Sequence, residues 1–127
     1  NVARYDLDGL REALLAGDVG RLTRTLDGLQ QEGEAPPLVL WALTEEVRAL
    51  AQIKLALQGG QSVDAALKEA RVWGGRQSLV RRALQRVDAR RSVAALRHAA
   101  QIDRMIKGIG GPADIWDEFL RLALRLC

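Results

Sequence analysis

Leucine, valine and isoleucine recur at intervals of three and four residues along most of the chain, the spacing that places apolar side chains on one helical face. In the first two runs, Asp6 and Asp18 stand where helix N-caps are expected, and Gly17 and Gly33 stand where the runs stop. The apolar positions of these runs are Leu7, Leu10 and Leu14, followed by Val19, Leu22, Leu26 and Leu29. The pattern predicts two short helices joined by a turn at Gly17.

The third run, residues 36–58, is the longest and begins with Pro36 and Pro37. Proline is tolerated in the first turn of a helix, where the missing N–H has no helical partner. The apolar positions form a spine of Val39, Leu43, Val47, Leu50, Ile53 and Leu57, with Leu40, Trp41 and Leu55 beside it. A helix that is apolar almost all round is typical of the centre of a bundle. We therefore expect a central helix that ends at Gly59.

Four further helices are predicted: one capped by Ser62, one after Gly75, one over about 89–107, and one capped by Asp114 after a glycine-rich loop. Their apolar positions are, in order, Val63, Ala66, Leu67 and Ala70; Leu79, Val80, Ala83, Leu84 and Val87; Val93, Leu96, Ala100 and Ile106; Ile115, Phe119, Leu122 and Leu126. No segment alternates with the period of a strand. The predicted fold is a single all-α bundle of about six to seven helices over residues 1–127.

Composition agrees with a packed helical domain. The 127 residues are 48% hydrophobic, 28% charged and only 4% aromatic, and Leu, Ala and Arg lose little side-chain freedom in helices. The single cysteine, Cys127, has no partner for an internal disulfide and fits a reducing cytoplasm. No apolar run approaches the roughly 20 residues that cross a bilayer, so no membrane contact is expected. The first residue, Asn1, suggests a domain of a longer protein.

The sequence offers little chemistry. His98 has no Cys, Asp or Glu three or four positions away, so it is expected to be a partly exposed helix residue rather than a metal ligand. Glu45 and Glu46 are adjacent, so their side chains point about 100° apart on a helix and cannot share a catalytic site unaided. Both are therefore expected to lie on a solvated face. The glycine pairs lack the spacing of a phosphate-binding loop, and no strand precedes them. We therefore expect no catalytic residue, no metal and no cofactor.

Residues 71–107 are strongly basic, with ten Lys or Arg against Asp88 and Asp103, a net charge of +8 in a chain whose total is +3. Arg82, Arg86 and Arg90 are four apart, so one helical face is expected to carry all three. Three interpretations stay open: arginines that serve the fold, an acidic neighbouring subunit, and nucleic-acid phosphates. The scarcity of aromatic side chains argues against a dedicated single-strand binder. Asp103 and Lys107 are expected to form a weak i,i+4 pair.

Five motifs occur in order: Tyr-Asp-Leu-Asp-Gly-Leu at 5–10, Leu-Asp-Gly-Leu-Gln-Gln-Glu-Gly-Glu at 26–34, Pro-Leu-Val-Leu-Trp-Ala-Leu at 37–43, Arg-Val-Trp-Gly-Gly-Arg-Gln at 71–77, and Asp-Arg-Met-Ile-Lys-Gly with Trp-Asp-Glu-Phe-Leu within 103–120. Each motif is short, but the ordered set resembles the C-terminal part of the delta subunit of bacterial DNA polymerase III. This subunit belongs to the clamp loader, and the resemblance spans nearly the whole chain.

The resemblance implies a role in assembly. Family members carry two AAA+ type domains before this region, the first of which contacts the sliding clamp, and the delta subunit lacks a working nucleotide site. The C-terminal helical domain packs with those of the gamma/tau and delta-prime subunits into a closed collar. The expected function is therefore a non-enzymatic oligomerisation domain of a polymerase holoenzyme in the cytoplasmic replisome. The alternative is a stand-alone helical nucleic-acid-binding domain that uses the basic region 71–107.

Trp and Arg tend to dominate the binding energy of protein interfaces. The candidate partner-interface or DNA-facing residues are Trp73, Arg76, Arg82, Arg86, Arg90, Lys107 and Trp116. Each tryptophan is expected to lie either at an interface or in the core. The loop at 108–113 is a further candidate for contact with primer-template DNA, although it has no aromatic residue and only Lys107 beside it is basic.

Overall fold

The computed structural model describes residues 6–127, and all regular structure in that range is helical. The helices are α1 (Leu7–Ala16), α2 (Val19–Gln31), α3 (Pro36–Gln58), α4 (Val63–Glu69), α5 (Arg76–Arg86), α6 (Ala89–Ile106) and α7 (Ile115–Leu124). This confirms the predicted all-α bundle. Tyr5, in the first sequence motif, lies outside the described residues.

The predicted helix ends are confirmed where a polar side chain or glycine defines them. The carboxylates of Asp6, Asp18 and Asp114 and the hydroxyl of Ser62 each accept a hydrogen bond from a backbone N–H in the first turn, at 2.7–3.1 Å. Gly17 ends α1 in the left-handed conformation, with φ of 69°. These local interactions satisfy N–H groups that have no helical partner, so each cap fixes where its helix begins.

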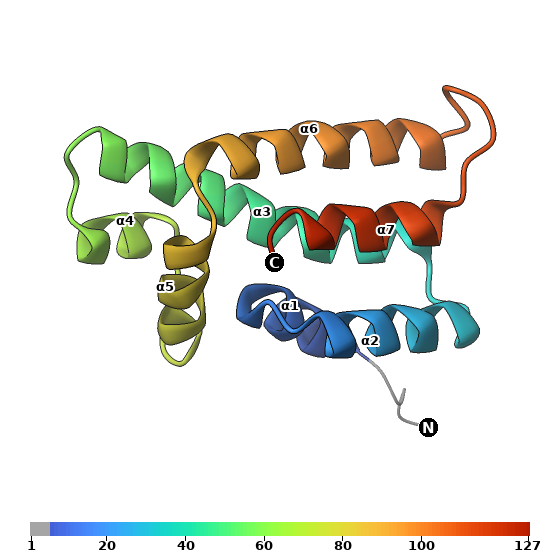
Figure 1. The fold of residues 1–127 in the computed structure, drawn as a ribbon, viewed down its shortest axis with the longest axis horizontal. Coiled ribbons are helices and arrows are strands. Elements are labelled where there is room, and N and C mark those ends of the chain that lie inside the picture. Colours follow the sequence, from blue (N-terminus) through green and yellow to red (C-terminus); the bar gives the residue numbers. More distant parts are fainter. Residues whose placement is uncertain (1–5) are drawn as a thin grey trace.

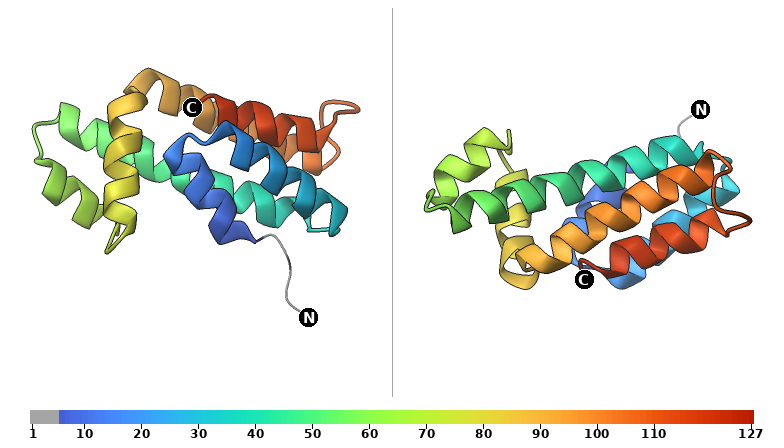
Figure 2. Two further views of the ribbon diagram at one scale, coloured as in Figure 1. Left: turned by 60° about the horizontal axis from the view of Figure 1, so that its bottom comes forward. Right: turned by 90° about the horizontal axis from the view of Figure 1, so that it is seen from above.

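The central position of α3 is also confirmed. This helix packs against α1, α4, α5, α6 and α7, and its spine from Val39 to Ile53 is buried. Figure 1 shows α6 and α7 running alongside α3, with α1 and α2 on the other side of α7. The short helices α4 and α5 lie together at one end of the molecule (Figure 1 and Figure 2). Leu55 and Trp41, also on α3, are exposed.

The inner face of α6 differs from the prediction. Ala100 is exposed, and Val93, Leu96 and Ile106 are only half-buried. The residues that pack inward are smaller on average: Ser92, Ala95, His98, Ala99 and Ile102. α6 therefore faces the core mainly with small side chains, which allow it to lie close to α3, and its larger apolar residues line the edge of the contact.

The basic residues at the α5–α6 junction do not share one helical face, which corrects the expectation for Arg82, Arg86 and Arg90. α5 ends at Arg86, Val87 is buried in the extended connection, and Arg90 belongs to α6. The guanidinium of Arg86 turns inward and donates to the carbonyls of Leu126, at 2.9 Å, and Leu15, at 3.1 Å, with a longer contact to Leu14.

Arg91 acts in a similar way on the neighbouring backbone. Its guanidinium donates to the carbonyl of Arg86 at 3.1 Å and to that of Cys127 at 2.9 Å. Arginine presents several N–H donors in a fixed fork, so one side chain can satisfy several carbonyls. Two of the ten basic residues of 71–107 therefore join α1, α5, α6 and the segment after α7.

His98 is buried, not partly exposed as predicted. Its Nδ1 accepts a hydrogen bond from Arg125 Nε at 2.9 Å, and its Nε2 lies 2.7 Å from a carboxylate oxygen of Glu118. Because Nδ1 is the acceptor, the neutral ring carries its proton on Nε2 and donates it to Glu118. Both partners lie on or next to α7, 20 and 27 residues away. The histidine thus ties α6 to α7.

Burial raises the pKa of the Cys127 thiol, and the nearby Arg86 and Arg91 offset only part of this effect. Because the pKa is higher in the folded chain, the thiol favours folding below its ordinary pKa, and this contribution disappears as the pH rises through the folded pKa. Alkylation by iodoacetamide at pH 8 should be several-fold slower in the folded protein than in urea, because the thiolate is the nucleophile. The rate should be measured against pH in both states; identical profiles would contradict this prediction.

Candidate interaction surface

A buried carboxylate organises the surface between α1, α3 and α5. Glu46 on α3 is fully buried, which corrects the expectation that Glu45 and Glu46 share a solvated face. Arg11 Nε lies 2.7 Å from one of its oxygens, and the two terminal nitrogens of Arg76 each lie 2.8 Å from an oxygen. Glu45 remains half-exposed beside Arg48. The pairing of Glu46 with two arginines balances a charge that would be unfavourable to bury alone.

Arg11 also positions an exposed indole. Its guanidinium carbon lies 5.4 Å from the ring centroid of Trp41, within the range of a cation–π interaction. Because Glu46 fixes Arg11 from the other side, the indole is supported by a chain of contacts that begins in the core. Trp41 nevertheless keeps 51% of its surface exposed. A large apolar side chain that is held in place and left open to solvent is typical of a protein-binding anchor.

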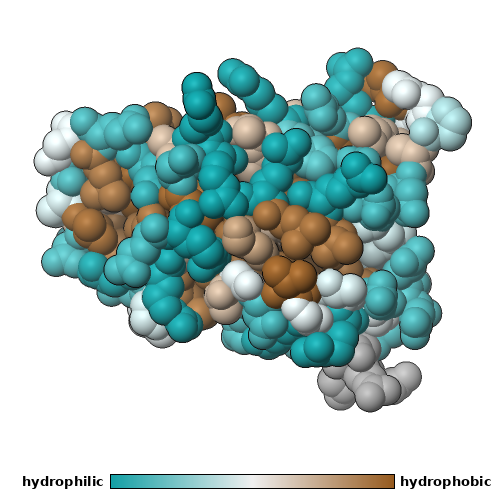
Figure 3. All heavy atoms as spheres, in the orientation of Figure 1, coloured by the Kyte–Doolittle hydropathy of each residue, from teal (hydrophilic) through white to brown (hydrophobic). Residues whose placement is uncertain are grey.

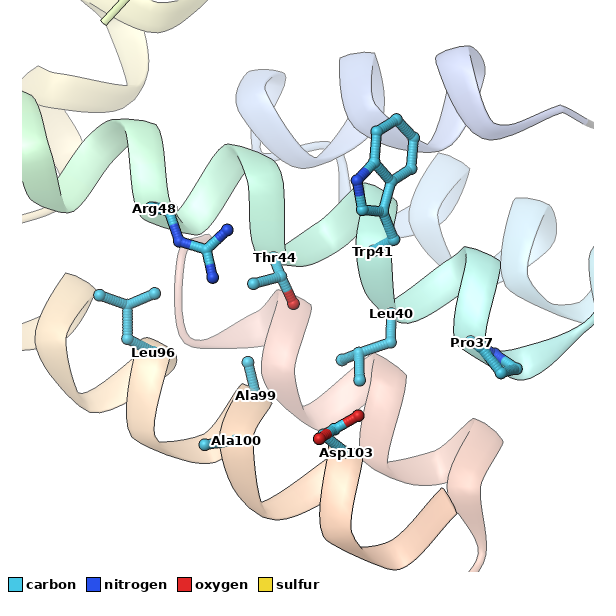
Figure 4. A pocket seen from close by; sticks show the side chains of 9 residues that line it. All are labelled: Pro37, Leu40, Trp41, Thr44, Arg48, Leu96, Ala99, Ala100 and Asp103. Atoms are coloured by element: carbon cyan, nitrogen blue, oxygen red, sulfur yellow. The ribbon is translucent and has the colours of Figure 1, made fainter. Parts of the chain in front are cut away.

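Trp41 stands at the edge of a groove between α3 and α6. The groove has a volume of about 380 Å³ and is lined by Pro37, Leu40, Trp41, Thr44, Arg48, Leu96, Ala99, Ala100 and Asp103. Figure 4 shows Leu40 reaching from α3 toward Ala99 and Asp103 of α6. Leu96 lies near Arg48 at the other end of the groove, and the indole of Trp41 points away from α6. The floor is apolar, and Arg48 and Asp103 supply charges at its rim. We call this feature the α3–α6 groove.

Other apolar side chains also reach the surface, among them Leu38, three residues before Trp41 on α3, and Ile109. Val19, Leu55 and Leu124 are each more than 40% exposed and belong to three different helices. In the face drawn in Figure 3, brown patches are visible near the α4 end and around the middle of the molecule, separated by polar side chains. Scattered exposed apolar residues are normal for soluble proteins, so the supported indole beside a groove is the stronger indication of a binding site.

The candidate residues from the sequence are dispersed over the molecule. Trp73 is 55% exposed in the turn between α4 and α5, and Arg76 is engaged with Glu46. Trp116 is half-buried, with its ring edge-on to Phe119 at a centroid distance of 5.3 Å. Lys107 forms the predicted pair with Asp103 at 2.7 Å. These positions do not form a single site.

A row of free arginines distinguishes the outer side of α6. Arg90, Arg97 and Arg104 are exposed, and their side chains form no hydrogen bond or ion pair within residues 6–127. By contrast, Arg81 pairs with Asp64, and Arg86 and Arg91 bind backbone carbonyls. The basic stretch therefore divides between arginines that serve the fold and others that face solvent, three of which lie on α6. We call these three the α6 arginine row.

Within residues 6–127, no three His, Cys, Asp or Glu side chains converge as metal ligands. Every buried side-chain nitrogen or oxygen in the same range has a hydrogen-bond partner. The helices described here also lack any that is long and apolar enough to cross a membrane.

The sequence profile of a family described as "Processivity clamp loader gamma complex DNA pol III C-term" matches residues 9–127. The chain belongs to this family. It is also similar to the DNA polymerase III subunit delta of Haemophilus influenzae, with 25% identity over an alignment 127 positions long that covers 91% of this chain. The alignment covers 36% of that relative, so the chain spans little more than a third of its length. The resemblance to the C-terminal part of the delta subunit is confirmed.

In this clamp-loader domain, the main surface features could not be recognised from local sequence. Trp41 was predicted to lie beside the spine of the central helix as a core or rim residue, and it was not among the candidate interface residues; Glu46 was predicted to be solvated. The available signal was the position of Glu46, three and four residues from Leu43 and Leu50 of the apolar spine, where a buried acid needs a cationic partner. The partners Arg11 and Arg76 lie 35 and 30 residues away, so the chain itself does not indicate them.

Proposed function

We propose that this domain is an assembly module of the DNA polymerase III clamp loader, which packs through its α3–α6 groove against the C-terminal domains of the gamma/tau and delta-prime subunits. The observation that carries the proposal is the exposed indole of Trp41, held by Arg11 and Glu46 beside an apolar groove. Interfaces are dominated by such anchors in their apolar centres. The family membership supplies the clamp-loader context.

The proposal assigns no chemistry to the domain itself. We assign contact with the sliding clamp and any coupling to ATP to regions outside this domain, which covers 36% of the length of the relative from Haemophilus influenzae. A collar that holds subunits together needs a stable fold and a complementary surface, and buried contact area supplies its binding energy. We infer a non-enzymatic subunit domain that acts in the cytoplasmic replisome.

Replacing Trp41 with alanine should weaken association with the gamma/tau and delta-prime C-terminal domains by roughly 30-fold, about 2 kcal/mol, the typical loss at an interface anchor. The fold should be retained because the indole is half-exposed. Size-exclusion chromatography with light scattering detects the complex, and titration of the mixed domains gives the affinity. Unchanged affinity of the Trp41→Ala variant would contradict the proposed surface.

Two further variants locate the interface. Leu124→Ala removes an exposed apolar side chain from α7, outside the groove, and should leave the affinity within about twofold if only anchors matter. Trp73→Ala tests the other exposed indole, which the sequence identified as an interface candidate. A loss with Trp73→Ala and none with Trp41→Ala would move the proposed interface to the turn between α4 and α5.

Nucleic-acid binding is the second candidate function, favoured by the α6 arginine row. It predicts that the domain alone binds DNA with an affinity that falls steeply as salt is raised, because counterions are released from the phosphates. The assembly function predicts little DNA binding by the isolated domain. Fluorescence anisotropy with labelled duplex and single-stranded DNA at two salt concentrations separates the two.

A further inference from the structure

The α6 arginine row has a regular geometry. Arg90, Arg97 and Arg104 are seven residues apart on one helix, so they project from the same side at intervals of about 10.5 Å. Their exposed side chains have no partner within residues 6–127. Three unpaired guanidinium groups in line on a rigid helix present a strip of positive charge.

This strip borders the α3–α6 groove. Arg97 and Arg104 each follow a residue that lines the groove, Leu96 and Asp103 respectively. Consecutive residues are about 100° apart around a helix, so the row lies next to the groove along its α6 wall. An apolar floor and a basic strip therefore run parallel to each other along α6, about a quarter turn apart.

We propose that the groove receives one α-helix of a neighbouring clamp-loader subunit, apolar on the side that enters the groove and acidic along the flank above the arginine row. The inference rests on the proposed function, because it names the chemistry of the partner at the same surface. A helix fits the spacing, since acidic residues seven apart on it repeat at the same interval of about 10.5 Å. The α3 wall from Pro37 to Arg48 is about 16 Å long, room for three helical turns.

A protein helix matches this surface better than nucleic acid does. A phosphate backbone would use the arginines but would leave the apolar floor, with Leu40, Leu96 and Ala99, uncovered. No Trp, Tyr or Phe stands on α6 for bases to stack on. An amphipathic helix uses both the floor and the charged strip.

The test reverses the charge of the row in the full-length subunit and measures association with the gamma/tau and delta-prime subunits. The control makes the same change in net charge at three exposed basic residues on other helices. The side chains of these three residues form no ion pair within residues 6–127. The row variant is R90E/R97E/R104E, and the control variant is R24E/K68E/R82E. At 50 mM salt the row variant should associate at least tenfold more weakly, largely through a slower association rate. The control should stay within twofold, and the difference should shrink at 500 mM salt.

Two further variants separate charge from folding. Replacing the three residues with lysine should keep most of the affinity, because the positive charges remain. Replacing them with glutamine should give an intermediate loss, and because all three side chains are exposed, the circular dichroism spectrum should not change. If the glutamate variant loses association but also unfolds, the glutamine variant decides the outcome. Weakened association of the folded glutamine variant supports the proposal, and unchanged association overturns it.

The outcomes distinguish this inference from the proposed function. If the wild-type subunit assembles and the row variant assembles equally well, the acidic helix is excluded and the assembly function stands. If the wild-type subunit does not associate with its partners, both fail together. If assembly is unchanged and the row variant loses affinity for a primer-template oligonucleotide, the row binds nucleic acid and the inference is overturned.

Discussion

Replacing Glu46 with alanine is expected to lower the free energy of unfolding by about 3 kcal/mol, the lower end of the range for breaking a buried ion pair. The carboxylate is fully buried and is contacted by Arg11 and Arg76 at 2.7–2.8 Å. Without it, both guanidinium groups lose their partner and a cavity remains in the α1–α3–α5 contact. The arginine side chains are 22% and 36% exposed and can turn toward water, which keeps the loss from being larger.

The adjacent Glu45 provides a matched control, because it is half-exposed and its pair with Arg48 is long, at 3.9 Å. Glu45→Ala should change stability by less than about 0.5 kcal/mol. Urea unfolding followed by circular dichroism gives both values, provided that the slope of free energy against urea is unchanged. If both variants lowered the free energy of unfolding equally, the buried ion pairs of Glu46 would not be what stabilises the fold. Where Glu46→Ala still folds, it should also weaken association, because Arg11 no longer holds Trp41.

Replacing Arg86 with alanine is expected to lower the free energy of unfolding by about 2–3 kcal/mol, although the sequence made this residue a candidate for a partner interface or a DNA-facing surface. Its guanidinium donates to carbonyls of Leu14, Leu15 and Leu126. Carbonyls at the end of a helix have no helical donor, and a charged donor to such a group contributes about 1.5–3 kcal/mol. Arg86 also packs against Gly17: a Cβ there would lie 2.8 Å from its guanidinium carbon.

Arg82, one turn earlier on α5, is the control for this variant. It is exposed, and its side chain forms no hydrogen bond or ion pair within residues 6–127, so Arg82→Ala should change stability by less than about 0.5 kcal/mol. Arg86→Lys should recover only part of the loss, since an ammonium group cannot present the fork that reaches three carbonyls. Thermal or urea unfolding of the three variants is the measurement. An Arg86→Ala variant as stable as Arg82→Ala would return Arg86 to the set of surface arginines.

The sequence predicted what depends on neighbours along the chain. Caps such as Asp6 and Ser62, the bounds of α3 and the inward spine of that helix all follow from interactions within a few residues. The errors have the opposite origin. Glu46 and His98 were predicted to be solvated or partly exposed helix residues, and Arg86 a surface arginine, because their partners lie at least 20 residues away in sequence.

The candidate surface was predictable only in kind. The abundance of arginine and the presence of tryptophan indicated an interface, but the sequence could not distinguish arginines that bind the backbone from those that face solvent. That division depends on the end of α5 at Arg86 and the extended conformation of Val87, which place Arg90 on a different helix from Arg86. The exposure of Trp41 was not predicted, because an aromatic residue on an apolar helix is most simply a core residue. Its exposure follows from the packing of α1 and α6 around α3.

The hydrogen bonds of Arg86 have a consequence for synthesis on the ribosome. They join positions 40, 71 and 72 residues apart, and α7 also packs against α2 and α6. Translation delivers the chain from the N-terminus, at about 5–20 residues per second, so α2 emerges several seconds before α7, which packs on it. α1 can already pack on α2 and α3 during that interval, but the face of α2 that α7 covers has no native partner. We expect the nascent domain to need protection by a chaperone until α7 has left the exit tunnel.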